Sequence, residues 1–183
     1  MMRIVGGTAR GRKIKAPPGS GTRPITDRAK EAIFNMLFSL DRLDEVDVVD
    51  LFAGSGSFGA ECLSRGARHV TFVEQNRGAV ATIQANLDHL GFTDRATVIT
   101  APVEAALSGL GLVDLAFCDP PYAWDRWSDL LVQIPADTLV AHSDRPIGLV
   151  DPWVELRSRS YGRSQIVIAQ RAQGDPTQSD QDQ

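Results

Sequence analysis

Cysteine is scarce in this sequence, and the residues that usually bind metals do not cluster. The two cysteines, Cys62 and Cys118, both lie in apolar stretches. A disulfide scaffold needs more than two cysteines, so we interpret Cys62 and Cys118 as buried, reduced side chains. The three histidines, His69, His89 and His142, have no partner at metal-ligand spacing. We interpret them as structural or surface residues, and we expect no metal.

Long apolar segments are also missing. No run approaches the roughly 18 residues that a membrane-spanning helix requires. The first residues are polar and glycine-rich, unlike the apolar centre of a secretory signal. We therefore expect a soluble, cytoplasmic, monomeric protein without a membrane partner. Its 183 residues suit one domain, or one domain with a short appendage.

Positive charge is rare except near the start of the chain. Residues 1–30 contain eight arginines and lysines and one acid, a formal charge of +7, whereas the remainder carries −11. A basic arm on an acidic body indicates a polyanionic partner for the arm. Lys30 belongs to this segment, and we expect an arm that binds RNA and is dispensable for cofactor binding. The candidate RNA contacts are Arg3, Arg10, Arg12, Lys13, Lys15, Arg23 and Arg28.

Strand-like and helix-like segments alternate along the chain. Short β-prone pieces at 3–5 and 13–15 predict a hairpin, and Thr26 is typical of an N-cap for an amphipathic helix at 27–40. Further helices are expected at 57–65, 77–90, 103–110 and 125–132, and strands at 46–52, 69–74, 96–100, 112–118 and 138–142. Segments 153–157 and 165–170 predict an antiparallel pair. This alternation predicts an α/β fold with a doubly wound, mostly parallel sheet, whose ligands bind at the carboxyl ends of the strands.

A glycine-rich loop follows the first of these strands. Gly54, Gly56 and Gly59 form the pattern GxGxxG, which suits a dinucleotide as well as S-adenosylmethionine. Asp50 precedes the first glycine by four residues. A carboxylate there repels a pyrophosphate but suits the ammonium group of a methionine moiety, although it could instead cap a helix or turn. The candidate cofactor contacts in this loop are Asp50, Phe52, Gly54, Ser55 and Gly56.

An acid also ends the next strand. Glu74 lies 20 residues after Gly54 and is followed by Gln75. A carboxylate at this position can accept both hydroxyls of an adenosine ribose. Glu74 and Gln75 therefore predict a nucleoside cofactor, and both NAD and S-adenosylmethionine fit.

The residues Asp119-Pro120-Pro121-Tyr122 are the most specific signal. Two prolines fix an extended backbone and leave its carbonyls free to accept hydrogen bonds. An aromatic amine is a poor nucleophile because its lone pair is delocalised. The Asp119 carboxylate and the Pro120 carbonyl can accept its two N–H groups and stabilise the positive charge that develops on nitrogen. Tyr122 can stack on the base. We predict Asp119, Pro120 and Tyr122 as the catalytic residues.

At these motifs, and at 22–35 and 54–67, the chain resembles the RsmD-type 16S rRNA guanine-N2 methyltransferases, a class I S-adenosylmethionine-dependent family. The likeness runs from about Arg3 to Arg171. It implies a Rossmann-like seven-stranded sheet with an antiparallel C-terminal strand and a small N-terminal β-hairpin. It also implies S-adenosylmethionine as cofactor, and guanine 966 of 16S rRNA, free or in a small-subunit assembly intermediate, as substrate. The expected units are a basic arm (1–22), a methyltransferase domain (23–171) and a disordered acidic tail (172–183).

The chain departs from the family in three places. Ala101-Pro102 occupies the position of a polar residue that the family offers to the adenine amino group. Asn76 stands where the family has an acid, and residues 135–152 match poorly.

Three other functions compete with this interpretation. A DNA methyltransferase acting on adenine N6 uses the same four-residue motif, but the chain lacks a separate target-recognition domain. An NAD-dependent oxidoreductase explains the glycine loop and Glu74 but leaves Asp119 to Tyr122 without a role. A catalytically silent RNA-binding module explains only the basic arm.

Overall fold

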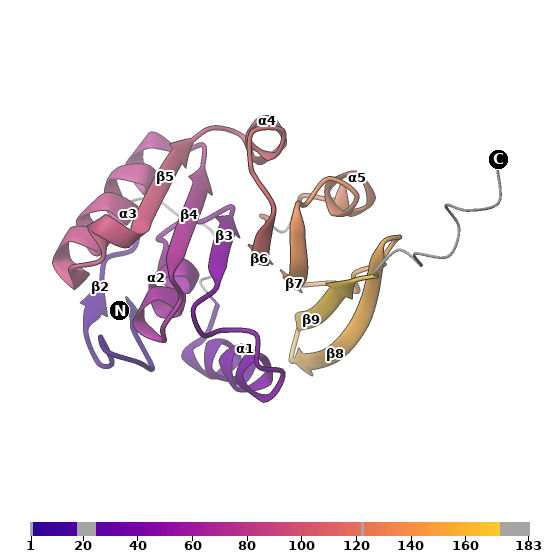
Figure 1. The fold of residues 1–183 in the computed structure, drawn as a ribbon, viewed down its shortest axis with the longest axis horizontal. Coiled ribbons are helices and arrows are strands. Elements are labelled where there is room, and N and C mark those ends of the chain that lie inside the picture. Colours follow the sequence, from indigo (N-terminus) through magenta and orange to yellow (C-terminus); the bar gives the residue numbers. More distant parts are fainter. Residues whose placement is uncertain (1, 18–24, 122, 173–183) are drawn as a thin grey trace, which may run out of the picture.

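A seven-stranded sheet with the order β5-β4-β3-β6-β7-β9-β8 organises the structure. The structure is a computed structural model that describes residues 2–17, 25–121 and 123–172 (Figure 1). Strands β3 to β7 are parallel, and β9 is antiparallel to both of its neighbours. This confirms the predicted mostly parallel sheet with an antiparallel C-terminal strand. The strands are β3 (Asp47–Leu51), β4 (His69–Glu74), β5 (Ala96–Thr100), β6 (Val113–Cys118), β7 (Ala136–Ser143), β8 (Trp153–Tyr161) and β9 (Ser164–Arg171).

Helices cover both faces of the sheet because successive strand residues point to opposite sides. Val48 of β3 packs in one core with α1, α2 and α3, whereas Val49 packs in a second core with α4 and α5. The predicted N-cap of α1 is confirmed, since Thr26 accepts a hydrogen bond from the Ala29 amide (3.2 Å). The helices are α1 (Asp27–Ser39), α2 (Ser57–Ser64), α3 (Arg77–Leu90), the 3-10 helix η1 (Thr93–Arg95), α4 (Val103–Leu107) and α5 (Trp127–Leu131).

The predicted N-terminal hairpin is present but is not a loose appendage. Strands β1 (Met2–Arg3) and β2 (Lys13–Ile14) pair antiparallel. Ile4, Ala9 and Ile14 are buried in the same core cluster as α1, α2 and the sheet. Apolar burial of this kind stabilises a fold, so the hairpin contributes to the stability of the whole domain.

A buried carboxylate fastens the hairpin to α2. Glu61 is fully buried and accepts hydrogen bonds from the amides of Val5 (2.8 Å) and Gly6 (2.7 Å). It also accepts from Arg65 Nε (2.8 Å), and Lys30 Nζ lies 3.7 Å away. Lys30 donates to the Arg3 carbonyl (2.9 Å), and its burial lowers the pKa of its ammonium group. Lys30 is therefore a structural residue, unlike the exposed cations of the arm.

Candidate functional site

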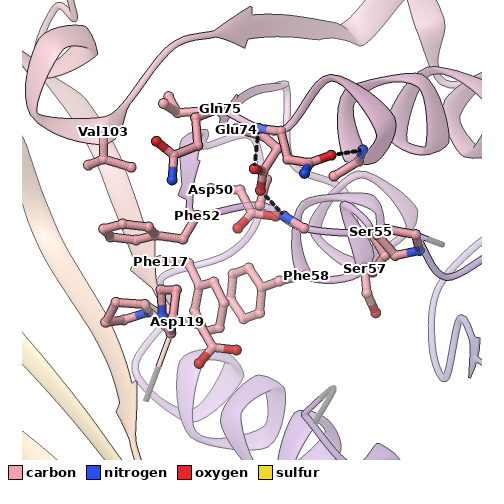
Figure 2. A pocket seen from close by; sticks show the side chains of 18 of the residues that line it. Asp50, Phe52, Ser55, Ser57, Phe58, Glu74, Gln75, Val103, Phe117 and Asp119 are labelled. Carbon is pink, nitrogen blue, oxygen red and sulfur yellow. Dashed lines mark hydrogen bonds between the residues drawn. The ribbon is translucent and has the colours of Figure 1, made fainter. Parts of the chain in front are cut away.

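A cavity of about 620 Å³ lies where β3, β4 and β6 end (Figure 2). This volume suits a small-molecule cofactor. The cavity lies at the edge of the sheet where the sequence places the ligand site, and its lining includes residues from the segments after all three strands. Of the predicted residues, Gly56 is not part of the lining, and Tyr122 and Arg23 lie outside the described residues. The predicted residues in the lining are Asp50, Phe52, Gly54, Ser55, Glu74, Gln75, Asp119 and Pro120.

The glycine loop connects β3 to α2 through residues with positive φ. Gly56 is the N-cap of α2 with φ 72°, and a Cβ there would lie 3.3 Å from Ile83 and Phe72 side-chain atoms. Gly56 therefore starts the helix at close range to its neighbours, and its contact with a cofactor stays a prediction. Gly54 has φ 56°, and the nearest atom to an added Cβ is the Phe52 carbonyl oxygen at 3.9 Å. The pocket is therefore open beside the Gly54 backbone.

Both carboxylate oxygens of Glu74 hold the backbone around the pocket. Oε2 accepts from the Gly54 amide (2.8 Å) and Oε1 from the Asn76 amide (2.8 Å). A carboxylate has about four acceptor positions, so two remain for ligand hydroxyls. Asn76 itself caps α3, accepting from the Ala79 amide (3.0 Å). Asn76 therefore has a structural role in this chain.

Asp50 is buried, and its carboxylate meets the first turn of α2. The Gly59 amide donates to Asp50 Oδ2 (2.9 Å), and the residue is 1% exposed. Burial raises the pKa of the Asp50 carboxyl well above its usual range, against the Gly59 bond, and the nearby carboxylates of Asp119 and Glu74 raise it further. The geometry thus gives Asp50 the helix-capping role that the sequence left as an alternative. Contact with a cofactor ammonium stays a prediction.

Acidic side chains gather at the strand ends that line the pocket. Asp50, Glu74 and Asp119 all line it (Figure 2). The raised pKa of Asp50 favours its neutral form, so Glu74 and Asp119 carry the acidic character that would repel a pyrophosphate, while Arg126 adds one cation to the lining. This charge pattern argues against NAD, which the glycine loop alone would accept.

An aromatic wall lines one side of the pocket, made of the predicted Phe52 and of Trp124, which the sequence analysis did not identify. Phe52 has φ 59°, a strained backbone for a side chain of its size, and its ring meets Trp124 edge-on with centroids 5.5 Å apart. Trp124 Nε1 is buried without a hydrogen-bond partner among the described residues. The guanidinium carbon of Arg126 lies 5.8 Å from the centroid of the Trp124 ring, and Arg126 forms an ion pair with Glu104. A tryptophan three residues after the Pro120-Pro121 pair was the available signal.

Asp119 extends from the end of β6 and has a histidine partner. Asp119 Oδ1 lies 2.8 Å from His142 Nδ1. His142 belongs to β7, within the segment that matched the family poorly. The sequence-based interpretation of His142 as structural or surface overlooked its place at a strand end, where side chains meet the pocket. Beneath Asp119, Phe117 stacks on Phe58 with centroids 3.6 Å apart.

The arm contributes to the pocket and to the core as well as to the surface. Met2, Ala16 and Pro17 line the pocket. Asn86 donates to the carbonyls of both Lys15 and Ser55 (3.0 Å each), which links the arm to the glycine loop. An arm dispensable for cofactor binding is thus not what the contacts favour.

The candidate RNA contacts differ in what they touch. Arg12 donates to the Leu90 carbonyl at the end of α3 (3.1 Å), and Arg3 pairs with Asp27 (3.1 Å). Arg28 lies 5.8 Å from the ring of Tyr161. Arg10, Lys13 and Lys15 are exposed. RNA binding by these side chains stays a prediction.

Neither a metal-ion site nor a membrane-spanning helix is found among the described residues. Across 2–17, 25–121 and 123–172, no group of three or more potential ligands could hold a metal ion. Within those same ranges, no helix combines the length and apolar character needed to cross a membrane.

The fold and the strand-end site together define a class I methyltransferase. A family model described as conserved hypothetical protein 95 matches residues 2–170. The chain belongs to this family, the RsmD family. It is 36% identical over 181 residues to YlbH of Bacillus subtilis, covering 91% of this chain and 97% of that protein.

A second relative and a solved structure are also similar to this chain over most of its length. Ribosomal RNA small subunit methyltransferase D of Haemophilus influenzae is 31% identical over 177 residues, covering 88% of this chain and 89% of that protein. The structure of yhhF from Escherichia coli superposes with a TM-score of 0.82 at 30% identity, covering 94% of this chain and 99% of the other.

Proposed function

We propose that the protein transfers a methyl group from S-adenosylmethionine to the exocyclic N2 amino group of a guanine in 16S rRNA, of the guanine 966 type. One observation carries this: Asp119 and Pro120 line the same pocket as Glu74 and the glycine loop. An amine acceptor and a nucleoside site thus share one cavity, which a methyl transfer between them requires.

The pocket residues fit S-adenosylmethionine, which when bound supplies an electrophilic methyl group on a sulfonium. Glu74 retains acceptor positions for two ribose hydroxyls. Its neighbours Asp50 and Asp119 suit the positive charges of the cofactor. Phe52, Val103 and Trp124 offer apolar surface for the adenine. Ala101-Pro102 stands where the family has a polar residue for the adenine amino group. Contact with these apolar side chains would hold the adenine instead.

At the other end of the pocket, acceptors face the target amine. The Asp119 side chain is 26% exposed, so it is accessible to a base that enters from outside. Its carboxylate and the Pro120 carbonyl accept the two N–H groups and stabilise the charge that forms on nitrogen. Tyr122 provides the ring on which the base stacks.

Two observations favour rRNA over other substrates that carry an amino group: the names of the relatives and the charge of the arm. Relatives named ribosomal RNA small subunit methyltransferase D align over much of the chain. The exposed cations Arg10, Lys13 and Lys15 lie on the arm whose residues Met2, Ala16 and Pro17 border the pocket. A nucleic acid held by the arm is therefore placed beside the site.

The test combines purified full-length protein, S-adenosylmethionine and either 16S rRNA or small subunits from a strain lacking the enzyme. Nucleoside mass spectrometry should detect N2-methylguanosine. Asp119→Ala should lower the rate by about 10²–10³, the usual cost of one preorganised electrostatic group, while cofactor affinity changes no more than a few-fold. N6-methyladenine in DNA would replace the rRNA proposal with the DNA alternative, and normal turnover by the variant would exclude the role of Asp119.

A further inference from the structure

A buried histidine stands behind the proposed amine acceptor. His142 lies near the carboxyl end of β7, one residue beyond Ala141, which pairs with Cys118 at the end of β6. This register brings it beside Asp119, the residue after Cys118. The His142 side chain is 3% exposed, and that of Asp119 is 26% exposed. Asp119 lines the pocket, whereas His142 does not.

The contact defines which nitrogen carries hydrogen. Asp119 Oδ1 lies 2.8 Å from His142 Nδ1, and an ionised carboxylate can only accept. Nδ1 must therefore be the donor. The other nitrogen, Nε2, is buried and has no partner among the described residues. Leaving a buried polar atom unpaired costs free energy, so a histidine that served packing alone would be poorly chosen here.

The strand surroundings make the same point. His142 pairs with Ile166 of β9, and its neighbour Ala141 is fully buried. An aliphatic side chain would fill such a position without an unpaired nitrogen. The bond to Asp119 is the one polar contact that distinguishes histidine from leucine among the described interactions of this side chain.

We propose that His142 is a positioning residue for Asp119, and this rests on the proposed function of Asp119. Its Nδ1–H holds Oδ1 and so fixes the rotation of the carboxylate. The second oxygen, Oδ2, then faces the pocket and accepts from the target amine. His142 touches neither the base nor the cofactor and acts only through Asp119.

Three variants of the full-length protein separate positioning from packing. In His142→Asn, the side-chain amide can donate from nearly the place of Nδ1. In His142→Gln, the amide reaches toward the place of Nε2, and His142→Leu has no donor. We expect Leu and Gln to lower kcat on 16S rRNA by about 10- to 100-fold, the effect of one hydrogen bond to a charged group, and Asn to restore most of it.

The KM and the dissociation constant for S-adenosylmethionine should stay within a few-fold of wild type in all three variants. Equal kcat values for Asn and Gln would overturn the proposal, even if the Leu variant failed to fold. Full activity of His142→Leu would overturn it while leaving the proposed function intact. An inactive wild-type protein would instead overturn the proposed function.

A spectroscopic measurement tests the pair without RNA. Nitrogen NMR of ring-labelled histidine should show a protonated Nδ1 for His142, and Asp119→Ala should shift that signal. A ring protonated only on Nε2 would contradict the geometry and overturn the proposal. The exposed His89 provides the reference signal, since it should not respond to Asp119→Ala.

Discussion

Glu74 has two tasks in the pocket, and Glu74→Ala removes both of them. Its oxygens hold the amides of Gly54 and Asn76, and we expect its remaining acceptor positions to receive a ribose. Glu74→Ala should therefore weaken both S-adenosylmethionine and S-adenosylhomocysteine by about 1.5–3 kcal/mol, the range for hydrogen bonds to a charged group. Calorimetric titration of both ligands checks this. Glu74→Gln, which keeps one acceptor oxygen, should lose less, and unchanged affinity in Glu74→Ala would remove Glu74 from the site.

Asp50 predicts a pH dependence of stability. Burial raises the pKa of its carboxyl in the folded state, so folding favours the protonated form. The favourable contribution is complete below the unfolded pKa of about 3.9 and is lost as pH rises through the raised folded pKa. Asp50→Asn cannot ionise and can still accept from the Gly59 amide. Its free energy of unfolding should therefore increase relative to wild type as pH rises across that window.

Urea unfolding of both proteins over a pH series measures this difference. The two chains share every other titrating group, so the difference reports Asp50 together with its coupling to Asp119 and Glu74. A constant difference at all pH values would mean that burial does not perturb this carboxyl.

Single residues at strand ends were predictable, and their partners were not. Asp119 and Glu74 were identified because a polar side chain directly after an apolar strand must lie at the ligand edge of a parallel sheet. His142 also ends a predicted strand, but its meaning depends on β7 lying beside β6 in the register that joins Ala141 to Cys118. A residue whose role comes from a neighbour 23 positions away is invisible to local pattern.

The attachment of the hairpin to α2 is the element-scale feature with the largest expected effect on stability. Glu61 is fully buried and accepts from Val5, Gly6 and Arg65. Breaking a buried charged network typically costs about 3–5 kcal/mol. Glu61→Ala should lower the free energy of unfolding by about that amount, measured by urea denaturation.

The exposed ion pair of Asp47 and Arg68 provides a matched control for Glu61→Ala. Its Oδ2 and Nη2 atoms lie 2.6 Å apart. An exposed ion pair contributes about 0–1 kcal/mol, so Asp47→Ala should change little. Similar losses in the Glu61 and Asp47 variants would mean that the hairpin is not held by this network.

The periodicity of apolar residues predicted which segments are helices and which are strands. Where each segment ends depends on its contacts in the fold. The helix expected at 103–110 ends at Leu107, ahead of Gly109 and Gly111. The strand expected at 153–157 continues to Tyr161, because β9 provides pairing partners along its length. Hydrogen bonds to a neighbouring strand extend a segment beyond what its own residues favour.

At the scale of the molecule, the sequence indicated a parallel sheet but not the order of its strands. β9 lies between β7 and β8, so the last strand of the chain is internal and β8 forms the edge. Such an order depends on long-range packing, which alternation of segments does not encode. The charge asymmetry was visible in the sequence, but the burial of Ile4 and Ile14 beneath it was not.

This packing decides how RNA binding by the arm must be tested. Deleting residues 1–15 would remove Ile4, Ile14 and the amides that Glu61 holds, so we expect loss of the fold together with loss of binding. Substitution of exposed cations avoids this. Arg10 and Lys13 are exposed and do not line the pocket.

The double variant Arg10→Gln/Lys13→Gln should bind S-adenosylmethionine normally and 16S rRNA weakly. If each side chain contacts one phosphate of single-stranded RNA, the slope of log affinity against log salt should become shallower by about 1.4, since each contact contributes about 0.7. The control is Arg157→Gln/Arg159→Gln, which removes the same charge from exposed positions of β8, at the opposite end of the sheet from the hairpin (Figure 1). Equal slopes in the two variants would show that RNA senses only the total charge. An unchanged slope in the arm variant alone would locate the RNA contacts elsewhere, because cofactor binding in the same sample shows that the fold is intact.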